Sequence, residues 1–383
     1  MNKKLKIAYV SGTRADFGLM TPILRAIRKS GKLELQVYAT GMHLMPEFGM
    51  TINQIKKEFK KVIKIEAIFK SDSMIGTANF TGDFLSKVIK AFIKNKPDLA
   101  LILGDRPEML CVAVACLYLK IPTAHVHGGE RTSAVDEVAR QAITKLSCIH
   151  LPATEESAQR IKKMGEEKSR IHIVGAPALD AILNEKLPKR NVLFKRLGIN
   201  PKQKIILLTQ HPVSDEWQKS GKQIKETIAA SKRFNLPVVA IYPNADAGGG
   251  KIIKELKKEK NNPKFHVFPN LEYKQFLTLE REAAVWIGNS SAAMIESSSF
   301  KAPVVNIGTR QSGRQRGKNV INVGYNRDEI TAAIKKSLFN KSYLAKLKKV
   351  KNPWGDGKTG LRAAKILEKL KLNSKLLNKQ ITF

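Results

Sequence analysis

Short, almost continuously apolar segments alternate with amphipathic helical segments along most of this chain. The clearest apolar segment is Leu99–Leu103, which is followed by helical spacing over Pro107–Leu119. Strands that are apolar throughout are buried on both faces, and their alternation with helices is typical of a parallel sheet covered on both sides. The sequence therefore predicts an α/β fold with doubly wound parallel sheets.

The alternation occurs in two series, and the length of 383 residues suits two domains. A polar and basic stretch at 184–200 separates the series, so we expect two doubly wound domains at 1–183 and 184–357 that face each other across a cleft. The first series of predicted strands is Lys6–Val10, Leu33–Ala39, Leu99–Leu103, Pro122–Val126 and Ile171–Val174. The second series is Lys204–Thr209, Val238–Tyr242, Phe265–Phe268, Ala284–Ile287 and Val304–Ile307.

The net charge of +35, from 68 basic and 33 acidic residues, raises the question of nucleic-acid binding. Residues 331–383 alone contain 14 Lys or Arg and two acids. However, Lys is more frequent than Arg, whose guanidinium forms the better bidentate hydrogen bonds to phosphates and base edges. The aromatic residues, which would stack on bases, are not interleaved with the basic clusters. We therefore expect a lysine-rich surface and no specific nucleic-acid partner.

No uncharged apolar run approaches the roughly 20 residues that span a bilayer. The three cysteines, Cys111, Cys116 and Cys148, cannot form a disulfide framework and contain no CxxC pair. His125 and His127 alternate as strand residues do, which argues against a two-histidine metal clamp. The composition predicts a cytoplasmic protein with no membrane partner and no bound metal.

Polar residues follow the predicted strands of the first domain, where ligands of doubly wound folds bind. Arg14 follows a glycine turn, Asp105 and Arg106 follow the most apolar strand, and Glu130 follows a Gly-Gly pair that lets the backbone approach a ligand. Helix capping is the alternative role for Asp105, and local pairing with Asp16 is the alternative for Arg14. The candidates in this half are Arg14, His43, Asp105, Arg106, Glu130, Asp136 and Arg140.

The second domain shows the same arrangement. Ser290 and Ser291 start a predicted helix, whose backbone N–H groups and hydroxyls suit a phosphate, although a plain N-cap is the alternative. Glu296 would suit a ribose diol better than a phosphate. The candidates in this half are His211, Asn244, Ser290, Ser291, Glu296 and Arg310, with Arg314 and Arg316 as further anion ligands.

Eight short motifs occur in order along the chain, and together they resemble the UDP-N-acetylglucosamine 2-epimerases. The resemblance is closer to the hydrolysing branch, which makes N-acetylmannosamine for sialic acid synthesis. The motifs are Thr-Arg-Ala-Asp (13–16), Gly-Asp-Arg (104–106), His-Gly-Gly-Glu (127–130), Asp-Glu-x-x-Arg (136–140), Gln-His-Pro-Val (210–213), Pro-Asn-x-Asp-x-Gly (243–248), Gly-Asn-Ser-Ser (288–291) and Gly-Thr-Arg-Gln (308–311).

The resemblance implies a glycosyltransferase-B type fold of two Rossmann-like domains, with UDP held mainly by the second. The closing segment 358–383 would then be a helix that returns towards the first domain, followed by a basic tail. It implies elimination of UDP to a 2-acetamidoglucal and addition of water, without a cofactor, in a homodimer. By position, the catalytic groups would be Asp105, Glu130, Asp136 and His211. Nucleotide contacts would come from Arg14, Ser290, Ser291 and Glu296, a phosphate contact from Arg310, and sugar-side or cleft-lining contacts from His43, Arg106, Arg140 and Asn244.

One position departs from the family pattern, because Gly18 stands where some relatives carry a serine near the nucleotide. Four other functions stay open. They are hydrolysing epimerisation of a UDP-2,4-diacetamido-2,4,6-trideoxyhexose on the way to legionaminic acid, non-hydrolysing epimerisation to UDP-N-acetylmannosamine, glycosyl transfer on the same fold, and nucleic-acid binding.

Overall fold

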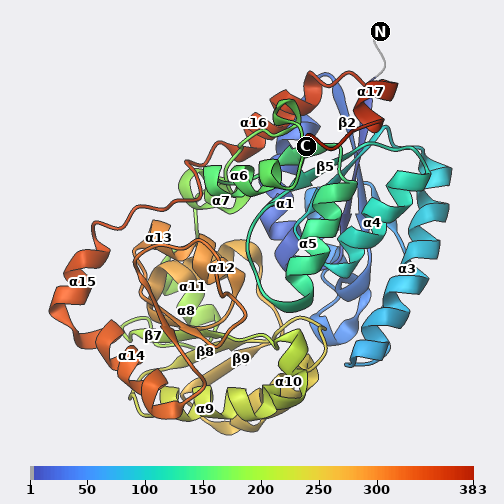
Figure 1. Cartoon of the computed structure of the whole chain (residues 1–383). Coiled ribbons are helices and arrows are strands. Elements are labelled where there is room, and N and C mark those ends of the chain that lie inside the picture. The colour runs from blue at the N-terminus through green and yellow to red at the C-terminus, as the bar shows by residue number, and fades with distance from the viewer. Residues whose placement is uncertain (1–3) are drawn as a thin grey trace.

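The computed structural model describes residues 4–383, which form two α/β domains stacked one above the other (Figure 1). Each domain is built on a six-stranded sheet, in the orders β3-β2-β1-β4-β5-β6 and β12-β11-β10-β7-β8-β9. All strand pairings within these two sheets are parallel. The predicted α/β fold of two doubly wound sheets is confirmed.

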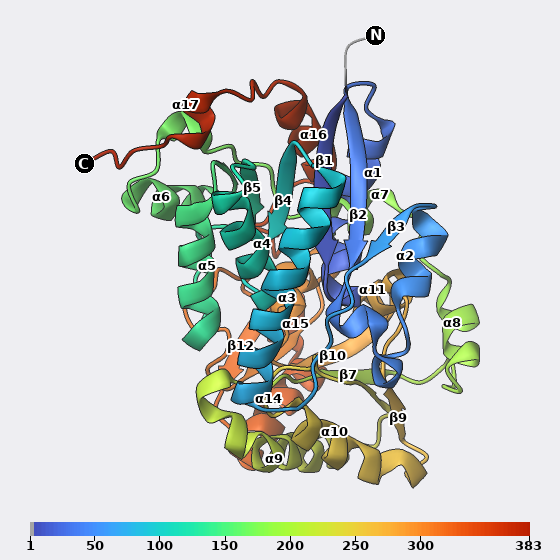
Figure 2. The same ribbon diagram turned by 90° about the vertical axis from the view of Figure 1, so that its right-hand side faces the viewer.

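The first sheet consists of β1 (Leu5–Ser11), β2 (Leu33–Ala39), β3 (Val62–Lys64), β4 (Leu99–Leu103), β5 (Thr123–Val126) and β6 (Ile149–Leu151). Its helices are α1 (Arg14–Lys29), α2 (Ile52–Glu58), α3 (Met74–Asn95), α4 (Pro107–Tyr118), α5 (Ala134–Leu146), α6 (Glu155–Lys163) and α7 (Pro177–Asn184). Figure 2 shows α3 and α4 in front of this sheet, with the second domain below it.

The second sheet consists of β7 (Ile205–Thr209), β8 (Val238–Ile241), β9 (Phe265–Phe268), β10 (Ala283–Gly288), β11 (Val304–Ile307) and β12 (Val320–Val323). Its helices are α8 (Arg190–Arg196), α9 (Ser220–Lys232), α10 (Gly249–Lys258), α11 (Tyr273–Glu282), α12 (Ser291–Ile295), α13 (Ser297–Phe300), α14 (Arg327–Phe339) and α15 (Lys341–Leu347). The chain ends with α16 (Thr359–Glu368) and α17 (Ser374–Leu377).

Alternate residues of each strand enter different cores because successive side chains point to opposite faces. In β1, Ile7 and Tyr9 pack with α1 and α16, whereas Ala8 and Val10 pack with α3 and α4. The second sheet is covered in the same way, by α9, α10 and α14 on one face and by α8, α11 and α12 on the other. Burial on both faces explains why these strands are apolar throughout.

The chain returns to the first domain at its end, where α16 packs against α1 (Figure 1). Asp180 on α7 accepts hydrogen bonds from the backbone N–H groups of Thr359, at 2.8 Å, and Gly360, at 2.7 Å. These bonds satisfy backbone donors at the start of α16 that have no partner within the helix. The side chains of Ala363 and Leu367 then complete the core beneath α1.

The short edge strands differ from the sequence predictions. Three observed strands, β3, β6 and β12, were not predicted. The strand predicted at Ile171–Val174 is wrong, because the chain there forms only an isolated parallel bridge between Ile171 and His150 of β6. Of the unpredicted strands, β3 and β6 have only three residues, which is too short for a clear apolar pattern, and β12 is a partly exposed edge strand.

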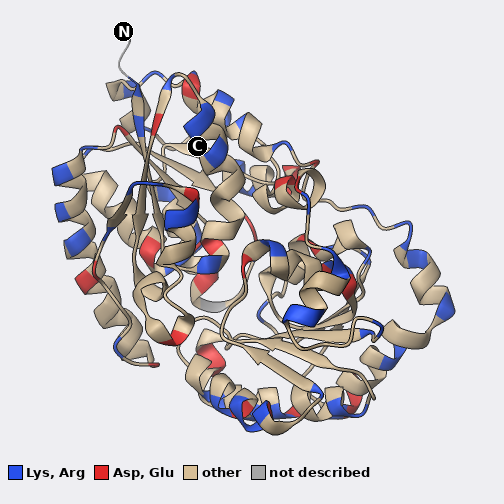
Figure 3. Ribbon diagram, turned by 180° about the vertical axis from the view of Figure 1, so that it is seen from behind, with Lys and Arg blue, Asp and Glu red and all other residues tan. Residues whose placement is uncertain are grey.

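Figure 3 shows Lys and Arg residues spread over helices and connecting segments of both domains. Each helix of residues 4–383 is too short or too polar to cross a lipid bilayer.

Candidate active site

The carboxyl ends of the two sheets face each other and enclose two adjoining cavities of about 150 and 100 Å³. Both lie where the strand order of a sheet reverses, which is where ligands bind in doubly wound folds. The cavities share five lining residues: Ala15, Leu19, Asn244, Ser291 and Arg310. We call them the acidic cavity and the serine cavity, after the side chains that line them.

Asp105 and Arg140 form an ion pair in the acidic cavity. Asp105 follows β4 and Arg140 lies on α5, so the pair connects two neighbouring elements of the first domain. Arg140 also donates from Nη1 to the backbone oxygen of His127 at 2.7 Å. That residue has φ of 62°, a left-handed conformation that side chains other than glycine seldom adopt and that functional sites often contain.

Asp136 is a carboxyl group of the acidic cavity whose pKa is raised towards neutrality. Burial, followed by repulsion from Asp105, raises the pKa of Asp136 to about 6, against the attraction of Arg310. Arg310 Nη2 lies 3.7 Å from Asp136 Oδ2, and the Asp136 side chain is still 38% exposed. The group is thus accessible to a substrate and can gain or lose a proton close to physiological pH.

Arg106 connects the two domains across the acidic cavity. Its guanidinium lies 3.2 Å from Glu108 Oε2 and 3.3 Å from Asp246 Oδ1, which belongs to the second domain. Burial would raise the pKa of Asp246, but Arg106 and Arg310 outweigh it and lower that pKa. Asp246 is therefore a carboxylate at neutral pH. It was not among the predicted site residues, although it lies in the Pro-Asn-x-Asp-x-Gly motif.

Two predicted site residues, Glu130 and His43, line neither cavity, and neither does Arg316, one of the two further anion candidates. Glu130 is buried, paired with His127 and with Arg314 of the second domain, which outweigh the effect of burial and lower its pKa. His43 is wholly buried, with Nε2 at 2.8 Å from Ser11 Oγ and Nδ1 at 2.8 Å from Thr51 Oγ1. The structure therefore corrects the expectation that these side chains line the cleft, because internal hydrogen bonds and ion pairs hold them behind its wall.

The serine cavity is lined by Arg14, Tyr273, Phe276, Ser290 and Glu296, among others. Arg14 donates from Nη1 to the backbone oxygen of Leu271 at 2.6 Å and lies over the Phe276 ring. Arg14 thus faces the second domain and not Asp16, which caps its own helix. The Ser290 side chain makes no capping hydrogen bond to α12, so it is free to contact a ligand.

His211 follows β7 and also lines the serine cavity. The Asn289 side chain holds its backbone, accepting from His211 N–H at 2.7 Å and donating to its carbonyl oxygen at 2.9 Å. Burial, with repulsion from Arg310, lowers the pKa of His211 to about 3. The imidazole is therefore neutral at physiological pH and can donate or accept a hydrogen bond.

Asp16 is a second residue that sequence reasoning did not select. It lines the acidic cavity and accepts from the backbone N–H groups of Gly12, at 2.9 Å, and Thr13, at 2.7 Å. Gly18, on the same helix, faces the Tyr273 ring so closely that a Cβ there would lie 2.7 Å from it. A serine at this position would therefore collide with Tyr273, which accounts for the departure from the family pattern.

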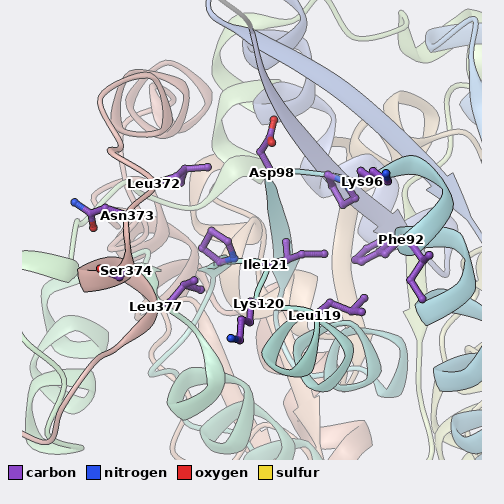
Figure 4. Close-up of a pocket in the computed structure, with 13 residues that line it drawn as sticks. Phe92, Lys96, Asp98, Leu119, Lys120, Ile121, Leu372, Asn373, Ser374 and Leu377 are labelled. Carbon is purple, nitrogen blue, oxygen red and sulfur yellow. The ribbon is translucent and has the colours of Figure 1, made fainter.

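A larger cavity, of about 720 Å³, lies away from this site (Figure 4). It is bounded by Phe92, Ile121 and Leu377, at the amino ends of β4 and β5 beside the C-terminal tail. Its lining is mostly apolar, and ligands of this fold class bind at the opposite edge of the sheet. Within residues 4–383, no three or more His, Cys, Asp or Glu side chains are grouped to hold a metal ion.

The family model for UDP-N-acetylglucosamine 2-epimerase matches residues 25–368 of this chain. The chain belongs to the UDP-N-acetylglucosamine 2-epimerase family. The resemblance read from the eight motifs and the expectation of an enzyme of this family are thereby confirmed.

Similar proteins support the same assignment. The chain is 39% identical to a hydrolysing UDP-N,N'-diacetylbacillosamine 2-epimerase of Legionella pneumophila, over 98% of both chains. It is 33% identical to a UDP-N-acetylglucosamine 2-epimerase of Neisseria meningitidis, over 87% of both. A crystal structure of the UDP-GlcNAc 2-epimerase from Neisseria meningitidis matches with a TM-score of 0.78 and 19% identity, over 96% of this chain and all of that one. The glycosyltransferase-B type fold of the family is thus confirmed.

Proposed function

We propose that this enzyme is a hydrolysing 2-epimerase of a UDP-2-acetamido sugar. The observation that carries the proposal is Asp136, an accessible carboxyl group with a pKa of about 6 beside the Asp105–Arg140 pair. Abstraction of a proton from C2 of the sugar needs a base whose pKa is close to the working pH. The adjoining serine cavity supplies a place for the nucleotide.

The nucleotide end of the substrate would occupy the serine cavity. Ser290 and Ser291 offer hydroxyl groups to the diphosphate, and Glu296 offers a carboxylate to the ribose diol. Arg310 lines both cavities and is therefore placed at their junction, where the bond between sugar and diphosphate would lie. A guanidinium there would stabilise the negative charge that develops on the leaving diphosphate.

The reaction needs two proton movements at C2. A base removes the C2 proton, the electron pair forms a C1–C2 double bond, and the C1–O bond to UDP breaks. Water then adds its oxygen to C1 of the resulting 2-acetamidoglucal, while an acid delivers a proton to the opposite face of C2. The products are UDP and the free C2 epimer. We assign the groups at C2 to Asp105 and Asp136 together, with His211 on the nucleotide side.

Substrate entry requires the domains to separate. The two cavities are smaller than the roughly 300–1,000 Å³ of typical ligand pockets. Contacts between the domains hold them closed, including the 3.3 Å contact of Arg106 with Asp246 and a 3.0 Å hydrogen bond from Ser133 Oγ to the backbone oxygen of Arg310. We therefore expect UDP-sugar binding to exchange some of these contacts for contacts with the substrate.

The similar proteins point to two sugars. Identity is 39% with the Legionella protein and 37% with a hydrolysing GDP/UDP-N,N'-diacetylbacillosamine 2-epimerase of Campylobacter jejuni, against 33% with the UDP-N-acetylglucosamine enzyme of Neisseria meningitidis. This order favours the 2,4-diacetamido sugar. UDP-N-acetylglucosamine, which the motifs suggested first, is the second candidate.

Competing turnover decides between the two sugars. Equal concentrations of both UDP-sugars are supplied to the enzyme, and products are followed by NMR. We expect UDP and a free 2,4-diacetamido sugar to form first. Faster formation of N-acetylmannosamine would transfer the assignment to UDP-N-acetylglucosamine, and formation of an epimeric UDP-sugar would contradict the hydrolysing reaction.

A further inference from the structure

A second buried carboxyl group lies next to the serine cavity. Glu280 on α11 is wholly buried, and neither of its carboxyl oxygens has a hydrogen-bond donor among the described residues. Glu296, whose side chain lines the cavity, interacts directly with Glu280 and also has an unpartnered oxygen, Oε2. A buried polar group without a partner is costly, so a carboxyl at position 280 calls for an explanation.

The charges around this pair do not balance if both groups are ionised. The charged groups that act on Glu280 are Glu296 and the Arg14 guanidinium, and both carboxyls also raise the pKa of the buried Tyr273 hydroxyl. One cation thus faces two buried carboxyl groups. Burial raises the pKa of both, and repulsion by Glu296 raises the pKa of Glu280 well above its ordinary value. The pKa of Glu296 rises less, to about 7.

We propose that Glu280 is a positioning residue, a carboxylic acid that keeps its proton and donates a hydrogen bond to the Glu296 carboxylate. This hydrogen bond pairs one carboxyl oxygen of Glu280 with one of Glu296 and leaves a single negative charge opposite Arg14. It also fixes the orientation of Glu296, so that its remaining lone pairs point to the ribose hydroxyls of a nucleotide. The inference rests on the proposed function, because it requires UDP in the serine cavity.

A purely structural role would be served better by an apolar residue. Replacing buried ionisable groups by apolar side chains of similar volume is often neutral or stabilising. Helix α11 already contributes Phe276 and Leu279 to the apolar core of the second domain, and Glu280 is buried among the same elements. A carboxyl group retained there costs stability, which a contribution to ligand binding would explain.

Calorimetric titration with UDP tests the inference in three full-length variants. Glu280→Gln keeps a neutral donor, so we expect UDP affinity within about two-fold of the wild type. Glu280→Leu removes the donor, and the affinity should fall about ten-fold or more, as for loss of a hydrogen bond to a charged group. Glu282→Gln, on the same helix but paired with Arg190 outside the cavity, is the matched control and should bind as the wild type does.

The pH profile separates positioning from a general structural effect. An ionised Glu296 accepts more strongly from the ribose hydroxyls than a protonated one, so its contribution to UDP affinity should fall as pH drops through its pKa, which is about 7 in the wild type. Because the Glu280 donor stabilises the Glu296 carboxylate, its removal raises the pKa of Glu296. The fall in UDP affinity should therefore occur at higher pH in Glu280→Leu but not in Glu280→Gln. The thermal midpoint of Glu280→Leu should be equal to or above that of the wild type.

Two results would overturn the inference while UDP still binds the wild type. One is that Glu280→Leu and the wild type have the same UDP affinity and the same pH profile. The other is that Glu280→Gln changes the UDP affinity ten-fold. Failure of the wild type itself to bind UDP would instead overturn the proposed function, and this inference with it.

Discussion

Arg314, in the segment between β11 and β12, donates from Nη2 to the carboxylate of Glu130, which follows β5 in the other domain. Both side chains are almost fully buried, and Glu130 also pairs with His127. One buried ion pair thus joins the two sides of the cleft at the wall of the acidic cavity, which Arg314 lines. Glu130 therefore holds the closed arrangement, and its predicted catalytic role stays a prediction.

Arg314→Ala should destabilise the closed enzyme, because it leaves the Glu130 carboxylate buried beside a single partner. Removing one member of a buried pair costs about 3–5 kcal/mol, so we expect a loss of this size in the free energy of unfolding measured in urea. Arg233→Ala, which breaks an exposed pair with Asp328, is the control and should cost about 1 kcal/mol or less. Equal losses in both variants would show that the buried pair holds nothing together.

Asp136→Asn should abolish turnover and remove an ionisation from the pH profile. Because burial and Asp105 raise the pKa of Asp136 to about 6, kcat/KM of the wild type should rise with pH through about 6 as the base loses its proton. We expect turnover of the variant to fall by at least a hundred-fold, with UDP affinity unchanged. A wild-type profile that is flat between pH 5 and 8 would contradict this role.

Gly18→Ala should weaken the contact between α1 and α11. The added Cβ would lie 2.7 Å from the Tyr273 ring, and overpacking of this kind costs about 1–3 kcal/mol. Alanine otherwise favours a helix, so Gly82→Ala is the matched control. Gly82 lies within α3, and a methyl group added to it would meet nothing within 4 Å. Gly82→Ala should therefore raise the free energy of unfolding by about 1 kcal/mol. Denaturation in urea measures both, and stabilisation by Gly18→Ala would show that the two helices separate freely.

Glu166→Gln should lower stability at neutral pH but not in acid. Glu166 accepts hydrogen bonds from Lys145 at 2.6 Å, His150 at 3.0 Å and Lys379 of the C-terminal tail at 2.7 Å. Burial alone would raise its pKa, but these partners outweigh burial and hold the pKa at about 2.

The pH dependence of this stability difference follows from the lowered pKa of Glu166. The stabilisation by Glu166 is complete above the unfolded-state value of about 4.3 and disappears as pH falls from there towards 2. We expect the free energy of unfolding of the wild type to exceed that of the variant by about 2 kcal/mol at pH 7, as for hydrogen bonds to a charged group. This difference in free energy of unfolding should disappear near pH 2. An equal gap at both pH values would contradict this assignment.

The parts of the fold that follow from local pattern could be predicted from the sequence. The strand Leu99–Leu103 is apolar at every position, and it was placed correctly because burial on both faces leaves a continuous signal. Strands such as Val62–Lys64 lie at a sheet edge and contain only three residues, so neighbours in space decide whether they pair. Domain boundaries, a homodimer and a cytoplasmic location stay predictions.

The candidate site was predictable where a residue follows a strand of the same domain, as Asp105 and His211 do. The sequence could not show which side chains would pair across the cleft. Asp246 lies at the site because it pairs with Arg106, which is 140 positions away. The Glu130 side chain does not line the cavity because it pairs with Arg314 of the other domain. Such pairings depend on how the domains meet, and no local pattern records that.

The central claim is that the enzyme removes the proton at C2 and releases UDP. The direct measurement is turnover of the two candidate UDP-sugars in D₂O, followed by proton NMR of the products. The account predicts free UDP together with a 2-acetamido sugar that is inverted at C2 and carries one deuterium there. Release of a sugar that keeps its original C2 proton and configuration would contradict it.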